Sequence, residues 1–183
     1  DGLAISAFLV TNVAAAMALV AWVILGHIHT GKMSAVGAAT GAVAGLVAIT
    51  PASGFVGPMG AIAIGLGAGV LTFYAVRIRY KFGFDDALEV MAVHGIGGIW
   101  GALATGIFAV GGIGLIDGDA TVLGYNAVAV LATIAYSFIV TFIILKILDV
   151  IPGLGLRADE AEEDAGLDVS LHGERAYVGD GAD

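Results

Sequence analysis

Five long apolar blocks dominate the sequence and leave few folds open to it. They cover approximately residues 3–26, 33–50, 59–76, 86–108 and 126–149. Each block approaches the roughly 20 residues that a helix needs to cross about 30 Å of hydrocarbon. Because lipid offers no hydrogen-bonding partners to the backbone, segments of this kind cross a bilayer as helices. The sequence therefore predicts an all-α, polytopic transmembrane helix bundle over residues 1–150.

The overall composition supports a membrane protein and excludes several other classes. Hydrophobic residues make up 59% of the chain and charged residues 13%, against about 45–50% and 25% in soluble domains. No basic region suits nucleic acid, so no nucleic-acid partner is expected. The absence of cysteine excludes disulfides and thiolate ligands. The histidines assemble no recognisable metal site, and we expect neither a metal nor another cofactor.

The net charge of −9 is concentrated at the end of the chain. Residues 149–183 hold ten of the sixteen acidic residues and two of the seven basic ones. This stretch has too few large apolar residues to form a core of its own. We therefore treat residues 151–183 as an acidic tail that follows the membrane domain.

The seven basic residues predict the orientation of the spans. All of them fall in the first or third loop, at the end of the fifth block, or in the tail. Lys and Arg near span ends are retained on the cytoplasmic side. Five alternating spans then place the first residue outside and the tail in the cytoplasm, in a multi-pass protein of the cell (plasma) membrane.

Small residues recur every four positions within the blocks. In the fourth block Gly97 is followed by Gly101, and Gly98 is followed by Ala102 and Gly106. This spacing forms a stripe on one helix face and lets neighbouring backbones approach closely. We assign Gly97, Gly98 and Gly101 to helix packing.

Ionisable residues mark the fourth block. The carboxylates of Asp85 and Asp86 suit the unpaired N–H groups of a helix start, which predicts a structural role. His94 lies eight residues after Asp86, about 12 Å along a helix axis and near mid-membrane. An ionisable side chain there indicates a functional site; the alternative is a histidine that only hydrogen-bonds a neighbouring helix. Because desolvation disfavours imidazolium, we expect the neutral ring.

Three segments in order carry a family resemblance. The first, residues 41–56, contains Thr50 and Pro51; the second, residues 85–108, contains the string VHGIGGIWG around His94; the third is the tail segment 166–177. Together they resemble the ammonium transporter family (Amt/Mep/Rh). The resemblance implies eleven spans, in which two inverted five-helix halves enclose a pore and a long last helix follows. The five spans here resemble the seventh to the eleventh.

The resemblance also implies roles for single residues. His94 matches the second of the family's paired pore histidines, Thr50 matches a threonine near the pore, and Val90 lies on the same path. The first pore histidine, the outer recruitment site and the gate phenylalanines belong to the other helices. We expect the chain, which begins at Asp1 rather than at Met, to be a C-terminal portion of such a transporter.

The leading hypothesis is transport of ammonium or ammonia through a hydrophobic pore lined by a neutral histidine. The resemblance further implies a homotrimer and a tail that binds a PII-type signalling protein through Asp168, His172, Gly173, Glu174 and Tyr177. The alternative is a membrane-anchored ammonium sensor or interaction protein whose tail binds such a regulator, without transport by this chain alone. Another small solute, such as carbon dioxide or water, is a variant of the first hypothesis. No nucleophile–base pair or nucleotide-binding motif appears, so we do not expect an enzyme.

Overall fold

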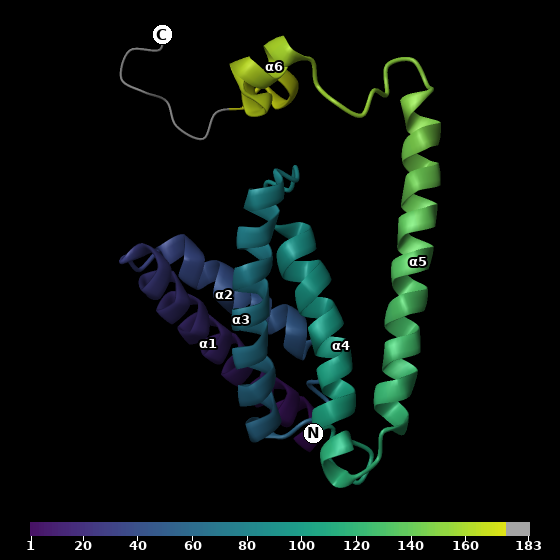
Figure 1. Cartoon of the computed structure of the whole chain (residues 1–183). Helices are drawn as coiled ribbons and strands as arrows, with labels where there is room; N and C mark the ends of the chain where they lie inside the picture. The colour runs from purple at the N-terminus through teal and green to yellow at the C-terminus, as the bar shows by residue number, and fades with distance from the viewer. Residues whose placement is uncertain (175–183) are drawn as a thin grey trace. The chain divides into compact units, whose positions relative to one another are not determined.

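The structure is a computed structural model that describes residues 1–174 (Figure 1). Its helices are α1 Gly2–Thr30, α2 Ala35–Ile49, α3 Pro58–Phe82, the π-helix η1 Val90–Gly95, α4 Ile96–Phe108, the 3-10 helix η2 Leu115–Asp117, α5 Thr121–Asp149, α6 Glu160–Ala165 and the π-helix η3 Asp168–His172. No strand occurs among residues 1–174, and the predicted all-helical class is confirmed. The chain divides into two compact units, residues 1–132 and 133–183.

Polar side chains and a glycine set the ends of the first helices. Asp1 accepts a hydrogen bond from the backbone N–H of Ala4, and Ser34 accepts one from the backbone N–H of Gly37. Each bond satisfies an amide that has no partner within its helix. Gly31 ends α1 with a φ of 72°, a left-handed conformation that glycine adopts without a steric penalty.

Helices α1, α2 and α3 pack closely because glycines line their contacts. A Cβ atom placed on Gly45 of α2 would lie 2.5 Å from the backbone oxygen of Ala14 in α1, and one placed on Gly65 of α3 would lie 2.4 Å from the same oxygen. Neither distance leaves room for a carbon atom. Both helices therefore reach the same point of α1 at a separation that only glycine permits.

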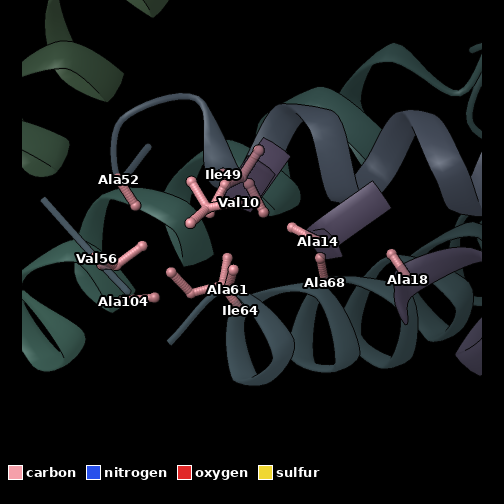
Figure 2. Packing of buried hydrophobic residues seen from close by; sticks show 11 residues of the cluster. Val10, Ala14, Ala18, Ile49, Ala52, Val56, Ala61, Ile64, Ala68 and Ala104 are labelled. Carbon is pink, nitrogen blue, oxygen red and sulfur yellow. The ribbon is translucent and has the colours of Figure 1, made fainter. Parts of the chain in front are cut away.

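Two clusters of buried side chains hold the first unit together. Figure 2 shows one of them, which consists of alanine, valine and isoleucine: Val10, Ala14, Ala18, Ala48, Ile49, Ala52, Val56, Ala61, Ile64, Ala68 and Ala104. The second contains Trp22, Ala44, Phe73 and Val93. The rings of Trp22 and Phe73 meet edge to face with centroids 5.5 Å apart. Because Val93 belongs to this second cluster, the π-helix η1 is anchored on the bundle.

Within residues 1–174, four helices are long and apolar enough to cross a membrane: α1, α3, the continuous helix of η1 and α4 (Val90–Phe108), and α5. Helix α2 has 15 residues, about 22 Å at 1.5 Å per residue. It ends at Ile49, shortly before Pro51, which cannot donate a helical hydrogen bond. Helices α1 and α3 extend beyond the predicted blocks, to Thr30 and Phe82, because backbone hydrogen bonding continues into the polar residues at the block ends.

Hydrogen bonds between polar groups shape the remaining segments. Helix α5 begins at Thr121, before the predicted block, where the backbone N–H of Thr121 donates to Asp119 over 2.8 Å. In the second unit, α6 starts with a capping box in which Asp159 and Glu162 each accept from the other's backbone N–H. None of the residues of α6 is buried. The acidic segment thus holds local helical structure through hydrogen bonds and not through an apolar core.

Candidate functional site

The π-helix η1 carries His94 at the start of the fourth span. The helix begins at Val90 rather than at the predicted residue 86, and the preceding residue, Glu89, has a φ of 56°. A left-handed conformation is uncommon for a residue other than glycine and requires support from its surroundings. π-helical turns are themselves rare and are frequent at functional sites. The backbone around Glu89 and η1 therefore departs from ordinary α-helical geometry immediately before His94.

Arg79 of α3 supplies that support. Its guanidinium pairs with the carboxylate of Glu89, and the two side chains are only 13% and 14% exposed. It also donates to the backbone oxygen of Phe84 over 3.0 Å and lies over the ring of Tyr80 at 3.9 Å. One side chain thus joins the end of α3 to both ends of the following loop. This pair was not predicted from the sequence, although Glu89, an acid inside an apolar block shortly after three bases, was a signal for it.

Asp86 satisfies the first amides of the π-helix. Its two carboxylate oxygens accept from the backbone N–H groups of Val90 and Met91 over 2.7 and 2.8 Å. Burial opposes ionisation of this carboxyl, but hydrogen bonds from Val90, Met91 and Ala92 and the charge of Arg79 outweigh it and lower the pKa of Asp86. Asp86 therefore caps the helix from four residues upstream.

His94 lies on the open side of this helix. Its neighbours Ala92 and Val93 are 4% and 2% exposed, whereas His94 itself is exposed. Three hollows in the first unit are lined by other residues. The narrow passage expected beside His94 is therefore not enclosed by the described helices alone. Among residues 1–174, no group of three histidine or acidic side chains could hold a metal ion.

The other two residues expected along the path are also exposed. Val90 is 55% exposed, and Thr50 follows the end of α2. The hydroxyl of Thr50 donates to the backbone oxygen of Leu46 over 2.7 Å, which leaves its oxygen as an acceptor. None of the three hollows brings Thr50 or Val90 together with His94.

The three glycines assigned to helix packing differ from one another. A Cβ atom on Gly101 would lie 2.2 Å from the backbone oxygen of Ala48 in α2, and one on Gly97 would lie 3.3 Å from the Val47 side chain. A Cβ atom on Gly98 would meet no heavy atom within 4 Å. The packing role predicted for Gly98 is thus not seen between the described helices, because this residue faces away from α2.

The tail residues form a short local structure in the second unit. Asp168 and His172 begin and end the π-helix η3, and Gly173 has a φ of 66°. The backbone N–H of Glu174 donates to the backbone oxygen of Asp168 over 2.9 Å. All four residues are exposed. Tyr177 lies outside the described residues.

Comparison of the sequence with known proteins identifies the family. The Ammonium Transporter Family matches residues 1–177. The chain is 48% identical to an ammonium transporter of Bacillus subtilis, over 97% of this chain and 45% of the relative. It is 46% identical to ammonium transporter Amt1 of Archaeoglobus fulgidus, over 97% of this chain and 46% of the relative. The chain spans less than half the length of these relatives.

Solved structures agree with the sequence comparison. Saccharomyces cerevisiae Mep2 matches with a TM-score of 0.82 and 33% identity, over 87% of this chain and 38% of that chain. A structure described as a sensor Amt protein matches with a TM-score of 0.83 and 33% identity, over 93% of this chain and 42% of that chain. The helices described above therefore correspond to part of the fold of these proteins. The chain belongs to the ammonium transporter family.

Proposed function

We propose that this chain forms part of a transporter that conducts ammonium or ammonia across the cell membrane, and that His94 lines the path. The observation that supports this proposal is the exposed ring of His94 on a helix whose adjacent residues, Ala92 and Val93, are buried. A histidine that faced lipid would carry a large desolvation cost without compensation. The remaining helices of the transporter, on this or another polypeptide, would cover this face and complete the pore.

The proposed chemistry uses the neutral form of His94. A cation moved into a dry protein interior loses its hydration at a cost of several kcal/mol, whereas a small neutral solute loses far less. Ammonium therefore transfers a proton to solvent water before the narrow part of the path, and ammonia crosses it. A neutral imidazole donates from one nitrogen and accepts at the other, so it can hydrogen-bond ammonia without repelling ammonium at the entrance. Thr50 and Val90 would line the same path.

Substitution of His94 tests this role. We expect His94→Ala to abolish or alter selective ammonium conduction while helix content is kept, because His94 is exposed and belongs to neither of the two buried clusters. Uptake of methylammonium into liposomes, with the protein purified from its own membrane, measures the effect. His29→Ala is the matched control, since His29 lies in the last turn of α1 and bonds the backbone oxygen of Leu25. Unchanged flux and selectivity in His94→Ala would remove this residue from the mechanism.

The similarity to a sensor Amt protein favours a second candidate function. In it, the membrane helices detect ammonium and the exposed tail residues Asp168, His172, Gly173 and Glu174, together with Tyr177, bind a PII-type regulator. The two candidate functions differ in two measurable properties: a transporter takes up methylammonium, whereas a sensor binds a PII protein without such uptake. Association of the reconstituted protein with a purified PII protein, in the absence of methylammonium uptake, would favour the sensor.

The assembly and orientation form part of the proposal. We expect a homotrimer whose tail lies in the cytoplasm. The cysteine-free chain allows single cysteines to report the side of each loop. Asp119→Cys should be labelled by an impermeant thiol reagent from outside the cell, and Ala165→Cys only after permeabilisation. Mass measurement in detergent gives the oligomeric state.

A further inference from the structure

The ion pair of Arg79 and Glu89 leaves part of its hydrogen-bonding capacity unused. The guanidinium of Arg79 bonds one carboxylate oxygen of Glu89 and the backbone oxygen of Phe84. Within residues 1–174, the buried Nε atom of Arg79 and the buried Oε2 atom of Glu89 have no hydrogen-bond partner. A pair of this kind adds little net stability, because desolvation of the two charges offsets their attraction. The geometry that the pair imposes explains it better.

That geometry is the left-handed backbone of Glu89, with a φ of 56° and a ψ of 33°. A residue with a Cβ atom is about ten times less populated in this conformation than in the right-handed one. Asparagine and glycine adopt it readily, but glutamate does not. The carboxylate of Glu89 is held by Arg79, which belongs to another helix, α3. A tertiary contact thus compensates for the local preference of the backbone.

The wide turn that carries His94 follows directly after Glu89. The backbone N–H of Ile96 reaches back five residues to the oxygen of Met91, and such a turn takes up one residue more than an α-helical turn. With an α-helical turn in its place, His94 would share the face of Gly97, where an added Cβ atom would lie 3.3 Å from a side chain of α2. The wide turn therefore keeps His94 exposed.

We propose that Arg79 and Glu89 are positioning residues for His94. Their ion pair holds Glu89 left-handed, and this conformation keeps the imidazole on the open face of η1. Neither side chain is required to contact the solute. The functional consequence rests on the role proposed above for His94, whereas the geometric one does not. If the pair only fastened the loop of residues 83–89 to α3, its removal would leave the orientation of His94 unchanged.

Two double variants separate the ion pair from the backbone conformation. Arg79→Gln with Glu89→Ala removes both charges, so no uncompensated charge stays buried, and alanine disfavours the left-handed conformation. Arg79→Gln with Glu89→Gly removes the same charges, but glycine adopts the left-handed conformation about as readily as the right-handed one. The glycine variant therefore restores the conformation without the ion pair. Circular dichroism checks that both variants keep the helix content of the parent chain.

Acylation of His94 by diethyl pyrocarbonate reports its exposure in the full chain in detergent, because the reagent attacks accessible neutral imidazoles. Mass spectrometry of peptides gives the rate at each histidine, and His29, whose ring bonds the backbone oxygen of Leu25, is the internal reference. We expect the rate at His94 to fall about ten-fold in the alanine variant. In the glycine variant it should stay within about a factor of two of the parent.

A third variant keeps the test decisive if the alanine variant does not fold. Arg79→Gln with Glu89→Asn should behave like the glycine variant, because asparagine also adopts the left-handed conformation. A ten-fold loss of the rate at His94 in the glycine and asparagine variants would overturn the proposal. An unchanged rate in a folded alanine variant would overturn it as well, since the orientation of His94 would then not depend on the ion pair.

Methylammonium uptake by the same variants keeps this inference apart from the proposed function. Uptake that falls in the alanine variant and recovers in the glycine variant supports both. If the acylation of His94 follows the expected pattern while uptake is the same in all variants, the positioning role stands and the role of His94 in conduction fails.

Discussion

Gly101 and Gly98 occupy neighbouring turns of α4, and the structure predicts opposite effects when each is replaced by alanine. The added methyl of Gly101→Ala would lie 2.2 Å from the backbone oxygen of Ala48, which is 1.2 Å short of the 3.4 Å at which ordinary contact begins. Because backbone cannot move aside like the end of a side chain, α2 and α4 must separate. Overpacking of this severity costs about 3 kcal/mol, and the better helix propensity of alanine returns about 1 kcal/mol.

Gly98→Ala carries no steric cost, since no heavy atom lies within 4 Å of the added methyl. The helix-propensity gain of up to about 1 kcal/mol is then the main effect. We expect Gly101→Ala to be destabilised by about 2 kcal/mol, and the two variants to differ by about 3 kcal/mol. Gly97→Ala, whose methyl would lie 3.3 Å from Val47, should fall between them.

Unfolding in mixed detergent micelles, followed by circular dichroism, measures these differences in the intact chain. Both variants add the same methyl group to the same helix, so changes in expression or in the unfolded state affect them alike. The reasoning is refuted if Gly98→Ala is as destabilised as Gly101→Ala. It is also refuted if Gly101→Ala unfolds at the same detergent composition as the parent chain.

Two further predictions concern the loop between α3 and η1. Glu89→Gln leaves the guanidinium of Arg79 without its counter-charge, so it should lower the unfolding midpoint more than Lys146→Gln, whose pair with Asp149 is largely exposed. Thermal unfolding of both variants checks that the midpoint of Glu89→Gln falls below that of Lys146→Gln. The pKa of Asp86 is lowered in the folded state, so its stabilising contribution is complete above about pH 4 and is lost as the pH falls through the folded-state value. Unfolding curves between pH 2 and 6 should show a weaker acid dependence in Asp86→Asn.

Hydropathy predicts where this chain forms helices but not where they end. The apolar blocks and the helices overlap because a segment that crosses the bilayer must be both apolar and helical. Helix ends depend instead on local hydrogen bonds, such as the one between Thr121 and Asp119, which starts α5 before the block at 126–149. A window of average hydropathy does not detect a single capping residue, and so the boundaries differ by several residues.

Spacing of glycines predicts that helices approach closely but not which glycine makes the contact. Gly97, Gly98 and Gly101 all belong to four-residue stripes, yet only Gly101 touches a neighbouring backbone. In a helix of 3.6 residues per turn, residues three and four apart lie on overlapping faces. The sequence therefore leaves two faces almost equally suited to packing. The position of α2, which is set by its own contacts with α1, selects between them.

The direction in which His94 points depends on a feature that periodicity does not detect. In a continuous α-helix, His94, Gly97 and Gly101 would share one face, because their spacings are three and four residues. The ring would then point toward α2. Each turn of the π-helix η1 takes up one residue more than an α-helical turn, which rotates His94 away from Gly101 and leaves it exposed. The left-handed Glu89, fixed by Arg79, starts this wider turn, and so the orientation of the candidate histidine depends on an ion pair between α3 and the loop that precedes η1.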